Sequence, residues 1–175
     1  MLARARAEAE TLVLGIDANA AGMAASASRA AHKPQRGGLA NARFAVCAVE
    51  ALPDALAGTA DLVTIQMPWA ALLRGLVRGD PSVTAPIARL LRPGGELRLL
   101  LSVAPRDAEL GVASLDEAAI DALAATFAAH GLAVRERHVA TPEDVTESRS
   151  TWARKLGIDR GDRAAWWLRL RAARR

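Results

Sequence analysis

The chain of 175 residues is predicted to fold as an α/β protein, with a mostly parallel sheet covered by helices on both faces. Short apolar runs of strand length alternate with alanine- and leucine-rich segments that have helical spacing. Turn signals such as Arg92-Pro93-Gly94-Gly95 separate these segments. Strands that alternate with helices pair mainly in parallel, because each helix returns the chain to the edge where the preceding strand began.

The first third of the chain predicts two strands with a helix between them. Leu12 to Ile16 is a short apolar strand that ends at Asp17, and an alanine-rich helix follows from about residue 20 to 31. The loop Lys33–Gly38 then leads into a strand at 43–48. The ten opening residues have the composition of the end of a helix.

The rest of the chain continues the alternation. We expect strands at 61–66, 96–103, 132–139 and 164–170, helices at 70–78, 83–91 and 115–130, and helix with loop at 142–156. The longest helix is predicted to bury one apolar face and to end at Gly131; that face comprises Leu115, Ala119, Leu123, Ala124 and Phe127. Trp166 and Trp167 are adjacent in the last strand and therefore point to opposite faces, so at least one is expected in the core.

Composition and charge narrow the class of protein. The length predicts one domain over residues 1–175. A single cysteine, Cys47, and the absence of a long apolar stretch favour a cytoplasmic protein, expected to be monomeric and without membrane contact. The net charge is +4, and nine basic residues lie between 149 and 175, opposed only by Asp159 and Asp162. This favours a polyphosphate partner, although general use of arginine for solubility would give a similar count.

Two tryptophans lie in matching polar settings. Trp69 follows the strand at 61–66, which places its indole at the carboxyl edge of the sheet, where open α/β folds bind ligands. Trp152 is flanked by Arg149, Arg154 and Lys155, a setting suited to a planar, anionic partner. Together they predict a flipped nucleobase held between two rings. The alternative is that both side chains are packing residues.

Three segments carry a resemblance to a known family. They are MPWAALLRG at Met67–Gly75, STWARKL at Ser150–Leu156, and the loop Lys33–Gly38. They resemble the 16S rRNA adenine-N1 methyltransferases that confer kanamycin–apramycin resistance, in the same order and over nearly the whole chain. The resemblance implies a class I (Rossmann-like) methyltransferase fold and S-adenosylmethionine as cofactor. It also implies a decoding-site adenine of 16S rRNA in the 30S subunit as substrate.

One part of that fold is not found in the 175 residues. A methyltransferase of this class needs a glycine-rich turn after its first strand, about 20 residues before the acid that binds the cofactor ribose. Asp17 has the position of that acid, so the first strand and the turn would precede Met1. We expect that the sequence starts late, at an internal Met or an alternative start codon. The rival interpretation is a shortened and inactive relative. Loss of a central strand would split the core, and the chain alone would bind S-adenosylmethionine weakly.

The resemblance assigns the cofactor to residues in two regions. Asp17 would bind the ribose hydroxyls, with capping of the next helix as its alternative role, which Asn19 could also fill. Glu50 would accept a hydrogen bond from the amino group of the cofactor adenine; the alternative is an ordinary exposed acid in a loop. The full set of expected cofactor contacts is Asp17, Ala48, Val49, Glu50, Gln66, Met67 and Leu72. No metal site is predicted.

For RNA, the resemblance implies that Trp69 and Trp152 stack on opposite faces of the target adenine. The basic residues expected to hold rRNA phosphates are Lys33, Arg36, Arg154, Lys155, Arg160 and Arg163, and the choice between Arg160 and Arg163 stays open. The family usually has glycine where this chain has Ala70. No side-chain base is required, because adenine N1 is itself a nucleophile, and His32, His130 and His138 are scattered. A methyltransferase with a small-molecule substrate and an RNA-binding relative without catalysis are the alternative functions.

Overall fold

The computed structural model describes residues 1–103, 111, 115–161 and 163–174. It divides into two compact units, Met1–Leu52 and Pro53–Arg175. The described strands form two separate sheets, β1–β2 in the first unit and β3–β4–β6–β5 in the second. The predicted α/β class is confirmed. That residues 1–175 act as one domain stays a prediction.

The first unit is a two-stranded parallel sheet with short helices. Its small core consists of Ala5, Ala30 and Ala42 with partly buried neighbours. The Asn41 side-chain amide donates to the carbonyl oxygens of Ala5, Glu8 and Thr11, each at 2.9 Å, and so fixes the first helix beside the strands. The elements are α1 Leu2–Ala7, β1 Val13–Asp17, α2 Ala20–Ala30, η1 Pro34–Arg36, β2 Ala42–Val46 and η2 Val49–Ala51.

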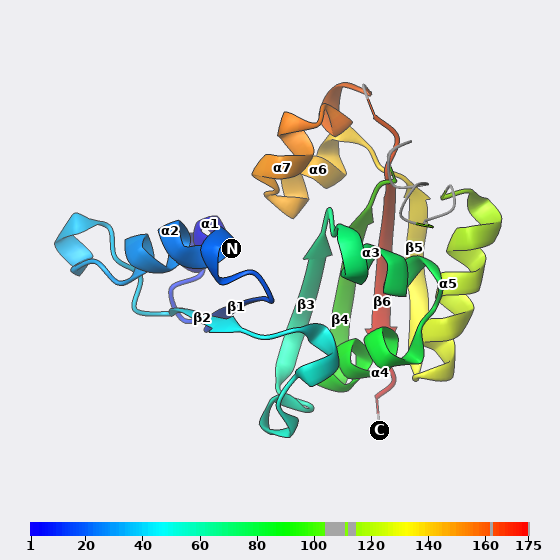
Figure 1. Cartoon of the computed structure of the whole chain (residues 1–175), viewed down its shortest axis with the longest axis horizontal. Coiled ribbons are helices and arrows are strands. Elements are labelled where there is room, and N and C mark those ends of the chain that lie inside the picture. The colour runs from blue at the N-terminus through cyan, green and yellow to red at the C-terminus, as the bar shows by residue number, and fades with distance from the viewer. Residues whose placement is uncertain (104–110, 112–114, 162, 175) are drawn as a thin grey trace. The chain divides into compact units, whose positions relative to one another are not determined.

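The second unit contains the four-stranded sheet and the remaining helices (Figure 1). Its strands are β3 Ala60–Gln66, β4 Leu91–Leu101, β5 Leu132–Val139 and β6 Trp166–Ala172. Its helices are η3 Asp54–Leu56, α3 Ala70–Val77, α4 Pro81–Leu90, α5 Glu117–Ala129, α6 Pro142–Ser148, α7 Thr151–Lys155 and η5 Ile158–Arg160.

The sheet of the second unit is mostly parallel, with one reversed strand. Strand β3 pairs with β4 in parallel, whereas β6 is antiparallel to both β4 and β5. The chain from β5 to β6 passes through α6 and α7 at the carboxyl end of β3 and then turns back (Figure 1). The last residues of β6 therefore lie at the opposite end of the sheet from α6 and α7.

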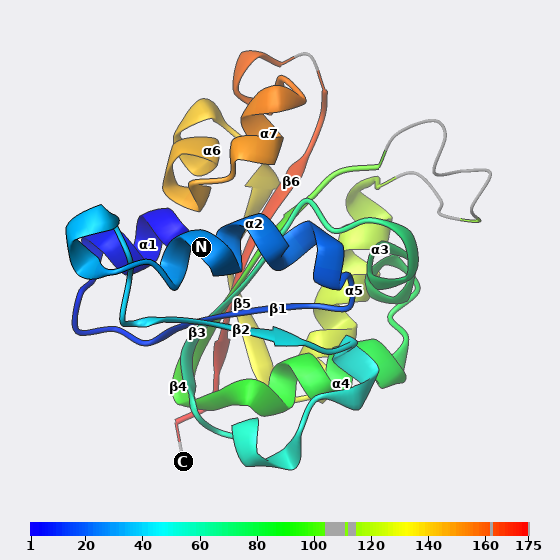
Figure 2. The ribbon, with the colours of Figure 1, turned by 60° about the vertical axis from the view of Figure 1, so that its left-hand side comes forward.

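The two faces of this sheet differ. Helices α3, α4 and α5 contact one another and cover one face (Figure 2), and Leu97, Leu99 and Leu101 of β4 are fully buried. Residues alternate between faces along a strand, so the second face carries Arg98 and Leu100. Helices α6 and α7 contribute to the buried cluster around Leu100, so helices cover part of both faces, as expected.

Helix α5 begins later than expected. The Asp116 carboxylate accepts from the Ala119 backbone N–H at 2.8 Å, which makes it the N-cap and leaves Leu115 outside the helix. Leu123 and Phe127 are buried as expected, half-buried Ala119 and Ala124 lie on the same face, and Ile120 is a further buried residue; only Leu115 was wrongly placed in the helix.

The turn signal at 92–95 lies within β4 and not before it. Leu91 pairs with Ala60 and Glu96 pairs with Leu62, so the four residues between them bulge from the ladder. Gly94 adopts a φ of +76° there. The four residues that were expected to separate the helix from the strand are therefore part of β4.

The adjacent tryptophans of β6 agree with the prediction that at least one of them lies in the core. Trp167 is 1% exposed and lies in the core, and half-buried Trp166 donates from its indole N–H to the Leu115 carbonyl oxygen at 3.0 Å. Within the described residues, no helix is long and apolar enough to cross a membrane.

Candidate functional site

Trp69 and Trp152 are both exposed at the carboxyl end of the second unit's sheet. Trp69 is 69% exposed and precedes α3, and Trp152 is 53% exposed in α7. Burial is what makes a large aromatic side chain stabilise a core. Neither ring gains much from packing, so the interpretation of these two residues as core tryptophans does not fit the structure.

The two exposed rings are anchored to one buried cluster. Met67, two residues before Trp69, and Ala153, directly after Trp152, both belong to the cluster that also contains Val145 and Trp167. Met67 is 7% exposed and Ala153 is fully buried. Because both backbones are fixed by the same packing, the two indoles have a common rigid support.

Helix α6, which leads to the Trp152 segment, is bonded to two neighbouring strands at its end. The Gln66 side-chain amide, at the end of β3, donates to the Ser148 carbonyl oxygen at 2.6 Å. Arg98 of β4 forms an ion pair with Glu147. These bonds hold the end of α6 against the carboxyl end of the sheet.

A third strand holds the beginning of α6. His138 Nε2 of β5 lies 2.8 Å from Asp144 Oδ2. The same carboxylate oxygen accepts from the Thr141 backbone N–H at 2.7 Å, and the Thr141 hydroxyl accepts from the Asp144 N–H at 3.3 Å. This capping box stabilises the first turn of the helix.

The backbone is left-handed at three points around the tryptophans. Met67, Ala70 and Arg149 have φ of 52°, 50° and 53°, and no other non-glycine residue of the described chain has positive φ. Such residues tend to occur at functional sites, held by surrounding structure. Glycine adopts left-handed φ without a Cβ clash, so the φ of Ala70 fits the glycine that the resemblance implies at this position.

Basic side chains surround Trp152 on α7 and beyond it. Arg154 and Lys155 are exposed, and Lys155 Nζ lies 6.0 Å from the centroid of the Trp152 ring. Exposed Arg160 lies in η5, and half-buried Arg163 donates to the Ser102 hydroxyl oxygen at 2.6 Å. Arg160 Nη1 lies 3.8 Å from Asp159 Oδ1, so both arginines have a partner within the chain, and which of them contacts a phosphate stays a prediction.

In the first unit, the expected cofactor residues lie at the carboxyl ends of β1 and β2. Asp17 ends β1, and its carboxylate accepts from the Asn19 backbone N–H at 2.8 Å. Asn19 caps α2 by accepting from Gly22 N–H at 3.2 Å, so Asp17 is not that cap. The Cys47 N–H donates to the Asp17 carbonyl oxygen at 3.0 Å, which places the segment of Ala48, Val49 and Glu50 at the same edge.

The loop Lys33–Gly38 carries two basic residues and ends in a tight turn. Exposed Lys33 directly precedes η1, and exposed Arg36 is its last residue. Gly37 has a φ of +79°, and a Cβ on Gly38 would lie 1.7 Å from the His32 carbonyl oxygen. The close turn therefore requires both glycines.

The remaining expected cofactor residues have different surroundings. Gln66 is half-buried with its amide bonded to Ser148, the Met67 side chain is in the core, and Leu72 is half-buried on α3. Their roles toward a cofactor stay predictions. The described part of the chain holds no cluster of three or more His, Cys, Asp or Glu suited to a metal ion.

Sequence reasoning did not identify the residues that position α6. Asp144, Glu147 and Ser148 were treated as part of a helix with loop. The run Thr141-Pro142-Glu143-Asp144 did carry a signal, because Thr followed three residues later by an acid resembles a capping box. The partners of these residues come from distant strands and have no local signal.

The α/β fold, the exposed aromatic pair at the carboxyl end of the sheet and the basic surroundings define a class of nucleic-acid-modifying transferase. The comparisons identify the family. The profile of the NpmA family, described as 16S rRNA (adenine(1408)-N(1))-methyltransferase, matches residues 1–170. The chain belongs to this family.

Curated relatives agree with the family. The 16S rRNA (adenine(1408)-N(1))-methyltransferase of Streptoalloteichus tenebrarius is 30% identical over 161 residues, covering 89% of this chain and 74% of the relative. The enzyme of the same description from Escherichia coli is 25% identical over 157 residues, covering 86% and 72%.

Solved structures support the fold and the cofactor. The aminoglycoside resistance methyltransferase NpmB1 is 35% identical with a TM-score of 0.81, covering 98% of this chain and 81% of that chain. A Trp-to-Ala variant of the Catenulisporales acidiphilia enzyme, solved with cosubstrate SAM, is 31% identical with a TM-score of 0.82, covering 98% and 80%. The predicted family, fold, cofactor and class of reaction are thereby confirmed.

Proposed function

We propose that this protein methylates N1 of the decoding-site adenine of 16S rRNA in the assembled 30S subunit and thereby gives resistance to aminoglycosides. The observation that carries the proposal is the pair of exposed indoles, Trp69 and Trp152, supported by one buried cluster. A small-molecule methyltransferase would need neither the second exposed ring nor the basic residues beside it.

The chemistry requires positioning more than proton transfer. S-adenosylmethionine supplies an electrophilic methyl group. The lone pair of adenine N1 lies in the plane of the base, so a base held by its two faces keeps that lone pair accessible. Stacking by Trp69 and Trp152 contributes about 1–3 kcal/mol per ring. Flipping a base costs a few kcal/mol. One stacked ring would barely offset this cost, whereas two rings together offset it.

The other expected residues have roles that fit their surroundings. Asp17 offers an exposed carboxylate suited to ribose hydroxyls, and the segment Ala48, Val49 and Glu50 lies at the same strand edge. Leu72, with Gln66 and Met67, would line the cofactor. The residues that would contact rRNA phosphates are Lys33, Arg36, Arg154, Lys155 and either Arg160 or Arg163.

The cellular setting follows from the substrate. We infer a monomer that acts in the cytoplasm on assembled 30S subunits and in which residues 1–175 serve one methyltransferase function. Shape and charge of the assembled subunit would supply most of the binding energy, since the basic residues contact phosphates and not base edges.

The test is methylation of purified ribosomal particles. The protein is incubated with 30S subunits, 50S subunits or protein-free 16S rRNA at saturating S-adenosylmethionine, so that weak cofactor affinity does not mask the reaction. Primer extension should stop at one decoding-site adenine in 30S subunits only. Absence of that stop, with the fold intact and with 30S binding retained, would favour the RNA-binding relative without catalysis.

A further inference from the structure

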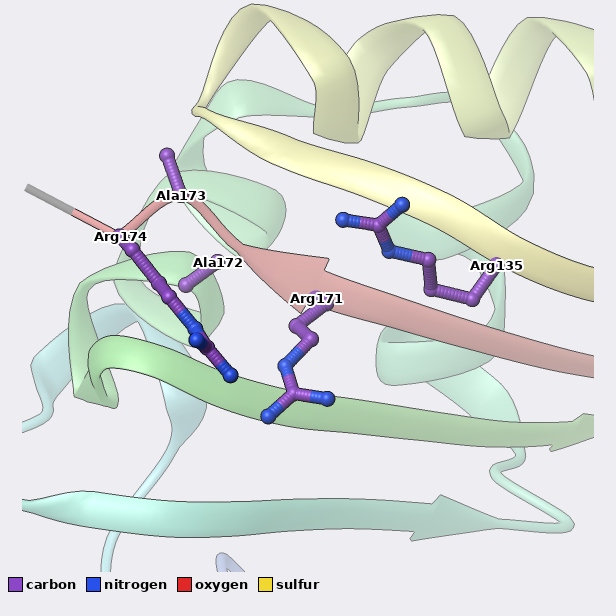
Figure 3. A pocket seen from close by; sticks show the side chains of 5 residues that line it. All are labelled: Arg135, Arg171, Ala172, Ala173 and Arg174. Carbon is purple, nitrogen blue, oxygen red and sulfur yellow. The ribbon is translucent and has the colours of Figure 1, made fainter.

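A second basic site lies at the opposite end of the sheet from the tryptophans. A cavity of about 330 Å³ is lined by Arg135, Arg171, Ala172, Ala173 and Arg174 (Figure 3). Strand β6 is antiparallel to β4. In the backbone register Trp166 lies opposite Leu101, and Arg171 lies opposite Glu96, five residues further back along β4. At the rise of a β-strand this separation is roughly 17 Å. The cavity is therefore distinct from the tryptophan site.

The backbone around this cavity is fixed on both sides. The Ala173 N–H donates to the Gly131 carbonyl oxygen at 3.1 Å, and the Ala173 carbonyl oxygen accepts from the Gly94 N–H at 3.3 Å. Arg171 Nε donates to the Gly94 carbonyl oxygen at 3.1 Å. A Cβ on Gly94 would lie 3.5 Å from Arg174 Cγ, so the Arg174 side chain crosses this glycine. The arginines thus extend from an ordered frame.

The charges of the three arginines are not neutralised within the described chain. Arg169, on the same strand as Arg171, pairs with Glu96 and Glu136. By contrast, no described carboxylate lies within ion-pair distance of Arg135, Arg171 or Arg174. Three like charges around one small cavity repel each other, and an anion would relieve that repulsion.

We propose that Arg135, Arg171 and Arg174 bind a phosphate group, and that the backbone of the rRNA substrate supplies it. The guanidinium group is planar and donates two parallel hydrogen bonds to phosphate oxygens, which makes arginine well suited to this ligand. Alanines at 172 and 173 leave space between the arginines for the group. The second part of the inference rests on the proposed function, because it takes rRNA as the partner.

The expected footprint on the ribosome is therefore wider than the target base. One end of the sheet would hold the flipped adenine, and the other would contact phosphates at a distance along the same rRNA surface. Such contacts position a protein without reading sequence. They also add to the salt dependence of binding.

The test compares two double variants that lose the same charge. Arg135→Gln with Arg174→Gln changes two exposed cavity residues, and Arg6→Gln with Arg43→Gln changes two exposed arginines of the first unit. Arg171→Lys keeps the charge but removes the planar fork. Calorimetry with inorganic phosphate measures the cavity itself, and 30S binding over a series of salt concentrations measures its use by rRNA.

We expect phosphate affinity to fall roughly tenfold or more in the cavity variant and in Arg171→Lys, since hydrogen bonds to charged groups are the strong ones. The slope of log K for 30S binding against log salt concentration should fall by about 2 in the cavity variant, one for each lost contact. It should stay unchanged in the first-unit variant. Lost phosphate binding with an unchanged slope would overturn the rRNA assignment and leave a site for a free phosphate. Unchanged phosphate affinity would overturn the site. The phosphate measurement does not involve methylation, so a failure of the proposed function would be seen separately.

Discussion

The Gln66 side-chain amide donates a hydrogen bond of 2.6 Å to the carbonyl oxygen of Ser148, and this bond joins the chain segments that carry the two exposed tryptophans. Gln66 ends β3, three residues before Trp69, and Ser148 ends α6, four residues before Trp152. A change at either end would alter the spacing of the two rings. Gln66 therefore acts as a positioning residue for the base site.

Replacing Gln66 with Ala should reduce kcat for methylation of 30S subunits, and loss of its proposed cofactor contact would in addition raise the KM for S-adenosylmethionine. Loss of one hydrogen bond costs about 0.5–1.5 kcal/mol, so we expect a moderate fall in kcat and a small fall in stability. Thr64→Ala, at an exposed position of the same strand, is the control. If the KM for S-adenosylmethionine rises while kcat is unchanged, Gln66 lines the cofactor, as the family resemblance implied, and does not position the rings.

Trp69→Ala and Trp152→Ala should each abolish methylation while leaving the melting temperature near that of the parent. Both rings are exposed, so their removal costs little packing energy. Phe at either position should retain partial activity, because stacking needs an aromatic face more than an indole N–H. Activity is measured on 30S subunits and as kanamycin resistance in a host.

Trp167→Ala provides the contrast for this experiment. Trp167 is 1% exposed, and truncating a large buried aromatic costs about 3–5 kcal/mol. This variant should melt early. Early melting of either exposed-site Ala variant, or full activity in one of them, would return that tryptophan to a packing role.

The sequence predicted the order of elements because their periodicity is local. The strand at 132–139 agrees in both bounds with β5, and the turn at Gly131 is where the helix was expected to end. The strand order and the reversal of β6 depend on pairing between distant residues and have no local pattern. The start of α5 was missed because the Asp116 cap outweighed the apolar Leu115 before it.

For the site, the exposed pair Trp69 and Trp152 could be predicted because aromatic residues are rare in this chain and occur in polar contexts. The positioning contacts could not. His138 and Asp144 are six residues apart, but Gln66 and Ser148 are 82 residues apart. Only the fold brings the second pair together.

Reversing the charge of the α7 surface should weaken binding to 30S subunits and reduce its dependence on salt. Arg154→Glu with Lys155→Glu changes two exposed cations beside Trp152. Each lost phosphate contact should lower the slope of log K against log salt by about 1. Arg6→Glu with Arg43→Glu makes the same change in charge elsewhere and should leave the slope unaltered. An unchanged slope in the α7 variant would make these residues ordinary solvated cations.

Ala70→Gly should stabilise the protein. Ala70 has a φ of 50°, where the Cβ of an L-residue comes close to backbone oxygen, at a cost of about 1–2 kcal/mol. Glycine removes that clash but loses more chain entropy on folding, so we expect a net gain of about 0.5–1 kcal/mol. Ala70→Val should be destabilising, because β-branched residues adopt this φ least readily. Urea unfolding measures both, and a loss of stability in the glycine variant would contradict the left-handed backbone.

Acid should weaken the second face of the four-stranded sheet through Glu96. Burial tends to raise the pKa of the Glu96 carboxyl, but hydrogen bonds from Arg98 and Arg169 lower it below its ordinary value of 4.5. A carboxyl with a lowered pKa in the folded state stabilises the protein above its unfolded pKa. That contribution is lost as pH falls from about 4.5 toward the lowered value.

Glu96→Gln tests this ion-pair network directly. The variant should be less stable than the parent at pH 7, and the difference in free energy of unfolding should shrink as the pH is lowered below the ordinary range of glutamate. Urea unfolding at a series of pH values from 7 to 3 measures the difference. Glu143→Gln, at an exposed position of α6, removes the same charge and should show no comparable pH dependence. A difference between parent and Glu96→Gln that stays constant over the whole series would show that packing, and not the charge of Glu96, accounts for the loss.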